Sequence, residues 1–106
     1  MGLEDSNSID AIGVHREQNC VTLALIDSEG WENEKQHLIM LQEKLNSYLN
    51  FILSGEIYSS YPDAKGKNVE INIYFKYDFP EKCKIFLGNV EELMTTEGIT
   101  LSHRVG

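Results

Sequence analysis

The chain has 106 residues, with 17 acidic and 9 basic side chains and a net charge of −8. This length allows one folded domain and is too short for two. The excess of acid disfavours binding to nucleic acid and to anionic membranes, because both need lysines and arginines to neutralise phosphates. It permits a basic protein partner.

The N-terminal part predicts a tail followed by a hairpin. Residues 1–8 are small and polar, so we expect a disordered tail ahead of a single domain over residues 9–106. Two short apolar runs, 9–14 and 20–27, flank the polar residues HREQN. This pattern indicates a β-hairpin. Its second strand alternates, with one side formed by Val21, Leu23 and Leu25 and the other by Thr22, Ala24 and Ile26.

A long amphipathic helix is predicted over residues 32–54. Its apolar residues recur at three- and four-residue steps and so share one face: Leu38, Leu41, Leu45, Tyr48 and Ile52. Gly55 follows the last apolar residue, as is typical of a C-terminal cap. The next stretch, residues 55–68, is polar and predicts a long loop, and loops of that length are often functional.

The rest of the chain predicts a strand, a helix and a strand. Residues 69–77 alternate, with Phe75 on the apolar side, which indicates a sheet with one face on the core and one face open. Asp78 can cap a helix that has Pro80 in its first turn and ends at Gly98. We expect the apolar face of this helix to comprise Cys83, Phe86, Leu87, Val90, Leu93 and Met94.

The predicted fold class is α+β, or mixed α/β, in the order ββαβαβ. Right-handed crossovers place both helices on one face of a four-stranded mixed sheet, which makes a two-layer sandwich. The order of the strands within the sheet stays open.

The central stretch, residues 37–66, has the sequence HLIMLQEKLNSYLNFILSGEIYSSYPDAKG. Together with Ile9, Asp10, Gly13, Asp27 and Trp31 ahead of it, this stretch resembles a family of small bacterial proteins known only as a domain of unknown function. The resemblance extends to the third predicted strand and is weaker after Asp78. It implies a soluble bacterial domain and brings no activity, cofactor or catalytic residue with it.

Residues that could support chemistry are scattered. His15, His37 and His103 have no neighbours at metal-ligand spacing, so we expect no metal site. Cys20 and Cys83 form no CxxC pair and are predicted to be buried free thiols. The glycines match no phosphate-binding pattern, so we expect no organic cofactor and no catalytic residue. Without a secretory segment or an apolar run long enough for a bilayer, the expected location is the cytoplasm.

Two surfaces are candidates for binding. The first is the 55–68 segment, where exposed tyrosines within a polar rim are typical of protein interfaces. Its candidate protein-binding residues are Glu56, Tyr58, Tyr61, Asp63 and Lys65. The alternative is that both tyrosines fold back over the helix end as a lid on the core. The second surface is the open face of the sheet, where Thr22, Ala24 and Tyr74 are a candidate dimer face, or else a solvated face.

These observations favour a non-enzymatic, protein-binding domain. Its size and acidity resemble those of toxin-neutralising immunity proteins, which is an analogy only. One alternative is a small enzyme or ligand-binding domain with a pocket beside residues 55–68. Another is a structural homodimer.

Overall fold

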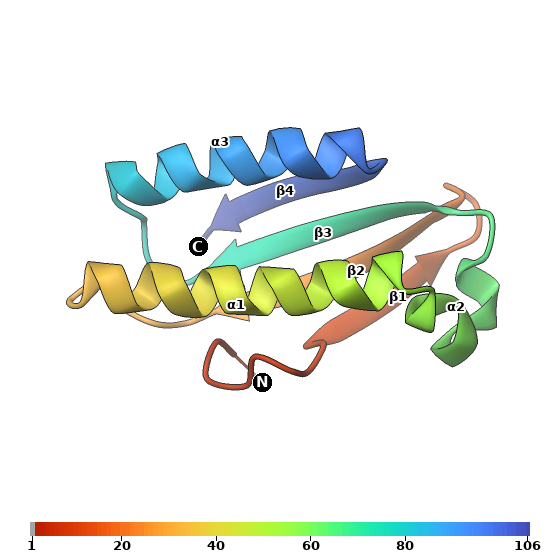
Figure 1. The fold of residues 1–106 in the computed structure, drawn as a ribbon, viewed down its shortest axis with the longest axis horizontal. Coiled ribbons are helices and arrows are strands. Elements are labelled where there is room, and N and C mark those ends of the chain that lie inside the picture. Colours follow the sequence, from red (N-terminus) through yellow and green to blue (C-terminus); the bar gives the residue numbers. More distant parts are fainter. Residues whose placement is uncertain (1) are drawn as a thin grey trace.

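A computed structural model describes residues 2–106 and arranges them in two layers (Figure 1). The sheet has the strand order β1-β2-β3-β4, which is also the order along the chain. Strand β1 is antiparallel to β2, whereas β2, β3 and β4 are parallel. The strands are β1 (Ala11–His15), β2 (Cys20–Asp27), β3 (Asn68–Phe75) and β4 (Ile99–Val105).

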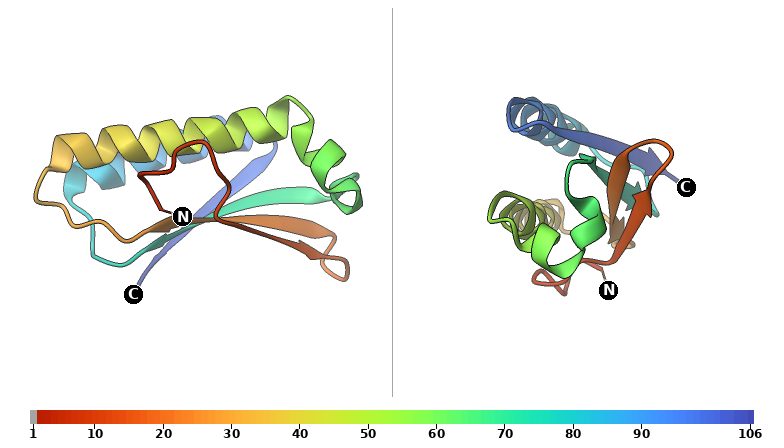
Figure 2. Two further views of the ribbon diagram at one scale, coloured as in Figure 1. Left: turned by 90° about the horizontal axis from the view of Figure 1, so that it is seen from below. Right: turned by 90° about the vertical axis from the view of Figure 1, so that its right-hand side faces the viewer.

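Two long helices cover one face of this sheet. Helix α1 (Glu34–Leu53) connects β2 to β3, and α3 (Glu81–Thr96) connects β3 to β4. Parallel strands need such crossovers, and two crossovers of the same hand bring both helices to the same side. Figure 2 shows the other face of the sheet without a covering layer. The predicted two-layer sandwich with a four-stranded mixed sheet is therefore confirmed.

The core lies between the helices and the inward side of the sheet. Register places Leu23 of β2 beside Ile71 of β3, which pairs in turn with Leu101 of β4, and all three are buried. The predicted stripe of α1 faces these strands, and Leu45 has only 2% of its surface exposed. Phe75 is buried to the same extent. The alternation of apolar residues therefore assigned the inward faces of β2 and β3 correctly.

The segment after α1 is more ordered than the loop predicted for residues 55–68. It contains a short helix α2 (Glu56–Ser60) and a 3₁₀ turn η1 (Pro62–Ala64). Gly55 has φ +85°, a left-handed conformation that reverses the chain direction directly after α1. Ile57 and Ala64 are fully buried, so both turns are anchored on the core.

Several predicted element ends are wrong. Asp78 does not cap α3: its Oδ1 accepts a hydrogen bond from the Phe79 N–H, and the cap residue is Pro80. Tyr77 lies beyond the end of β3 and is exposed. Leu93 is also exposed, although the periodicity of α3 placed it on the apolar face.

The N-terminal segment departs from the predicted disordered tail of residues 1–8. Met1 lies outside the described residues, but Leu3 is part of the buried core. The buried Lys44 Nζ donates hydrogen bonds to the backbone oxygens of Gly2 and Asp5. A buried ammonium needs acceptors for its three N–H groups, and this segment supplies two of them. The segment therefore lies against α1 in Figure 2.

The two cysteines are both free but differ in position. Cys83 of α3 is buried, as predicted. Cys20 is only half-buried, because it alternates with the inward-facing Val21 and so lies on the uncovered face of the sheet. The prediction that both thiols are buried is wrong for Cys20.

Candidate functional site

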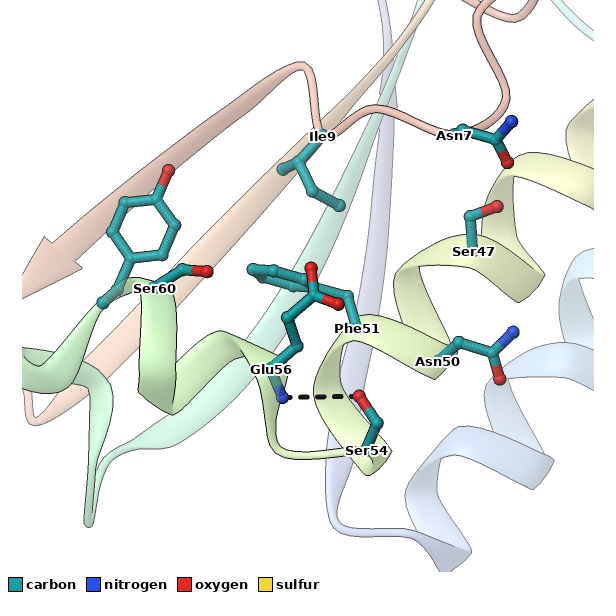
Figure 3. A pocket seen from close by; sticks show the side chains of 9 residues that line it. Asn7, Ile9, Ser47, Asn50, Phe51, Ser54, Glu56 and Ser60 are labelled. Carbon is teal, nitrogen blue, oxygen red and sulfur yellow. Dashed lines mark hydrogen bonds between the residues drawn. The ribbon is translucent and has the colours of Figure 1, made fainter.

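A hollow of about 620 Å³ opens at the junction of the N-terminal segment, the end of α1 and α2 (Figure 3). Three stretches of chain contribute to its wall, and most of the lining side chains are polar. The lining residues are Asn7, Ile9, Ser47, Asn50, Phe51, Ser54, Glu56, Ser60 and Tyr61.

The local sequence explains why the chain turns here. The apolar stripe of α1 ends at Ile52, and Gly55 permits the reversal that follows. The Ser54 hydroxyl oxygen accepts a hydrogen bond of 3.3 Å from the Glu56 N–H, which satisfies one of the free donors at the start of α2. Burial of Ile57 then fixes α2 against the body, so the hollow lies between two anchored elements.

Two aromatic rings and one carboxylate give the hollow its character. The rings of Phe51 and Tyr61 meet edge to face, with centroids 6.4 Å apart and planes at 76°. Glu56 lines the same hollow as Phe51 and adds a carboxylate to it (Figure 3). Glu56 forms no ion pair with any of residues 2–106. The site therefore combines an aromatic surface with an unpaired negative charge.

The structure divides the residues predicted for protein binding. Glu56 and Tyr61 line the hollow. Tyr58 is half-buried and packs against the core, so it has the lid position that was the alternative for both tyrosines. Asp63 lies outside the hollow and pairs with Arg16 of the β1–β2 turn at 2.9 Å. Lys65 is exposed and does not line the hollow.

The residues predicted as a dimer face lie elsewhere. Thr22 and Ala24 of β2 and Tyr74 of β3 point away from both long helices, as expected from the alternation. The Arg104 guanidinium lies over the Tyr74 ring at 5.9 Å. This uncovered face is separate from the hollow beside α2.

A buried Asp–His couple at the opposite end of α1 was missed by sequence reasoning. The Nε2 atom of His37 is 2.6 Å from Oδ2 of Asp27, and the two side chains are 3% and 0% exposed. The Trp31 ring stacks on the imidazole at 3.5 Å with an interplanar angle of 5°. The sequence did indicate that both residues face inward. Asp27 continues the alternation of inward-facing residues in β2, and His37 precedes Leu41 by four residues and so shares its face of α1.

The hydrogen bonds of the couple define its protons. Nδ1 of His37 is 2.8 Å from the Gly30 carbonyl oxygen, which can only accept, so Nδ1 carries a hydrogen. One further proton must lie between Nε2 and the Asp27 carboxyl. Burial raises the pKa of that carboxyl above its ordinary value, and the hydrogen bond and charge of His37 oppose the rise. With both ring nitrogens engaged, the couple fastens α1 to the end of β2.

A second buried polar cluster surrounds Lys44. Its Nζ is 2.7 Å from Oδ1 of Asp10, and Oδ2 of Asp10 accepts from the Ile26 N–H. The Tyr48 hydroxyl donates to the Ala24 carbonyl oxygen at 2.6 Å and accepts from the Asp10 N–H. Burial raises the pKa of the Tyr48 hydroxyl, so it stays protonated and keeps its donor. This cluster ties the N-terminal segment, β2 and α1 together.

Neither a metal centre nor a membrane span is found in the described part of the chain. Within residues 2–106, no three His, Cys, Asp or Glu side chains are grouped so that they could hold a metal ion. None of the helices in that range is both long and apolar enough to cross a bilayer.

The fold and the hollow define a small, acidic two-layer α/β domain with an open polar and aromatic site at one end. A family model described as a family of unknown function (DUF6572) matches residues 1–106, so the chain belongs to that family. No curated protein and no solved structure matches the chain.

Proposed function

We propose that the protein is a non-enzymatic, protein-binding domain whose contact surface is centred on the hollow beside α2. The observation that supports this best is the contrast between the two ends of α1. The Asp27–His37 couple is buried, and both of its ring nitrogens are engaged in internal hydrogen bonds. The hollow instead presents the Glu56 carboxylate and the Tyr61 ring at the surface.

The composition of the hollow suits a protein partner. Tyr61 is 39% exposed, and tyrosine provides a large contact area at a low cost in conformational entropy. Serine and asparagine side chains surround the two rings, which gives the arrangement of an apolar centre with a polar rim. Aromatic residues in such positions often contribute most of the binding energy.

The net charge of −8 favours a basic partner. Small acidic domains of this kind include immunity proteins that neutralise toxins, so we propose this role by analogy of size and acidity. If a captured partner is a toxin, adding the purified protein at equal concentration should suppress the activity of that toxin. Full toxin activity in the saturated complex would remove the immunity role.

A second candidate is the binding of a small molecule in the same hollow. Its volume of about 620 Å³ lies within the range of roughly 300–1,000 Å³ that is usual for ligand pockets. The wide opening and the polar rim favour the protein partner over this alternative.

Capture of partners from the native cell by the tagged protein tests the proposal. Tyr61→Ala should abolish capture of a specific partner, because it removes the exposed ring of the site. Tyr77→Ala is the matched control, since Tyr77 is 47% exposed and does not line the hollow. A partner that is retained by both variants, or lost from both, would contradict a surface centred on the hollow. Recovery of no specific partner after chemical cross-linking would contradict protein binding.

A further inference from the structure

The hollow beside α2 carries an electrostatic preference that goes beyond protein binding in general. Glu56 contributes a carboxylate with no internal counterion among residues 2–106. Two basic residues of the same end are engaged elsewhere. Arg16 pairs with the Asp63 carboxylate, and Lys67 donates to the Asp63 carbonyl oxygen. Lys65 is exposed and does not line the hollow, so the negative charge in the hollow is open to a cationic group from outside.

The end of α1 adds to this negative potential. The carbonyl groups of a helix C-terminus carry a partial negative charge that favours cations. Helix α1 ends at Leu53, and its last turn has no basic side chain. Asn50 and Ser54, which belong to this helix end, both line the hollow. A bound cation would thus lie close to the helix terminus as well as to Glu56.

The aromatic rings add a third cation-favouring feature. The faces of phenyl and phenol rings attract a cation within about 6 Å. Because Phe51 and Tyr61 stand almost at right angles, the hollow is bounded by rings in two orientations. Phe51 and Glu56 both line the hollow, so one planar cation bound there could contact both groups.

We propose that the hollow binds a guanidinium group, presented by an arginine side chain of the partner protein. A guanidinium is planar, stacks on aromatic rings and donates two parallel hydrogen bonds to a carboxylate, whereas an ammonium is a strongly hydrated point charge. The hydroxyl groups of Ser47, Ser54 and Ser60 provide acceptors for its remaining N–H groups. The arginine source rests on the proposed protein-binding function, and the guanidinium preference rests on the site alone.

Titration of the full chain with small probes tests the chemistry of the site. The probes are N-acetyl-arginine methylamide, the matching lysine compound, and N-ethylguanidinium as a free guanidinium compound. Amide chemical shifts of Ser54, Gly55 and Glu56 in ¹H–¹⁵N spectra would report binding. We expect N-acetyl-arginine methylamide, the blocked arginine, to bind more tightly than the blocked lysine. Its affinity should fall as salt is raised, because the charges of the site are exposed.

Two charge-matched variants locate the interaction. Glu56→Gln should weaken binding of the blocked arginine about tenfold, because it removes one charge-assisted pair of hydrogen bonds. Glu43→Gln removes the same charge from an exposed position on α1 outside the hollow and should leave binding unchanged. Both variants should keep the wild-type melting temperature, since both side chains are exposed.

Each result has a distinct meaning. Absence of binding, equal binding of arginine and lysine compounds, or equal weakening by both variants would overturn the guanidinium site. Binding of N-ethylguanidinium without binding of the blocked arginine would overturn the arginine source. If Tyr61→Ala abolishes partner capture but Glu56→Gln does not weaken it, the protein-binding function stands and the guanidinium proposal fails.

Discussion

The Lys44 ammonium is buried together with three oxygen acceptors. They are the backbone oxygens of Gly2 at 2.6 Å and Asp5 at 3.0 Å, and the Asp10 carboxylate at 2.7 Å. Removing an ammonium from water is costly, and the cost is offset only where its donors and its charge are all matched. All three donors of Lys44 and its charge are matched here, so the Lys44–Asp10 pair holds the N-terminal segment and α1 in one arrangement.

Lys44→Met should therefore destabilise the protein by about 3–5 kcal/mol, because it leaves the Asp10 carboxylate buried without a counterion. Denaturant melts would measure the change. Lys35→Met is the matched control on the same helix, and its exposed side chain predicts a change within about 0.5 kcal/mol. Adding Asp10→Asn to Lys44→Met should restore part of the loss. Equal free energies of unfolding for Lys44→Met and Lys35→Met would show that the Lys44–Asp10 pair contributes no stability.

The two thiols should differ in reactivity. Burial raises the pKa of the Cys83 thiol to about 12, and the Asp27 and Glu34 carboxylates add to the rise. Because the thiolate is the reactive form, native Cys83 should resist alkylation at mildly alkaline pH. Cys20 is half-buried on the uncovered face and should be modified first. Peptide mapping by mass spectrometry after iodoacetamide treatment would test this, with denatured protein as the control in which both react. Modification of native Cys83 at the rate of Cys20 would contradict its burial.

At the residue scale, periodicity identified buried positions but not the partners of buried polar groups. Asp27, His37 and Lys44 all fall on or beside the inward faces that alternation and helical spacing define. Their partners come from other segments: Asp10 is 34 residues from Lys44, and His37 is 10 residues from Asp27. Such pairing depends on how the elements pack, which local patterns do not contain.

At the scale of elements, the inward face assigned to α1 can be tested by the same Leu→Ala substitution at a buried and at an exposed position. Leu45 is 2% exposed and Leu53 is 54% exposed. Leu45→Ala should cost roughly 2–5 kcal/mol through lost burial and cavity formation. Leu53→Ala should cost less than about 1 kcal/mol, since its side chain is already largely in water. Denaturant melts would give both values, and equal costs would refute the assigned faces.

The elements that the sequence predicted well are long and periodic, and those it missed are short. The alternation of β3 and the stripe of α1 sufficed for the two layers and for the helices on one face. Helix α2 has five residues, too few to show a helical period, so residues 55–68 were predicted as a loop. The wall of the hollow is formed in part by α2 and the N-terminal segment, which the sequence predicted as a loop and a disordered tail. The sequence therefore indicated residues 55–68 as a candidate surface but not the hollow itself.

At the scale of the whole molecule, the uncovered face of the sheet is the second surface that a partner could contact. Its central residues are small or half-buried, with Ala24 beside Asn72 and Ile26 beside Tyr74 in register. Figure 2 shows that no element of residues 2–106 lies over this face. Antiparallel and mixed sheets tolerate one solvated face, so the open layer alone does not require a partner.

The homodimer hypothesis places this face between two copies of the chain. In a two-fold arrangement the same patch meets itself, so Tyr74 would lie at or near the symmetry axis together with Thr22 and Ala24. If this hypothesis holds, the wild type should sediment as a dimer at tens of micromolar. Tyr74→Glu should sediment as a monomer, because it brings two carboxylates into a desolvated contact. Tyr77→Glu is the control, since Tyr77 lies beyond the end of β3 and is exposed. A monomeric wild type, or a Tyr74→Glu dimer as tight as the wild type, would remove this face as a dimer interface and leave it solvated.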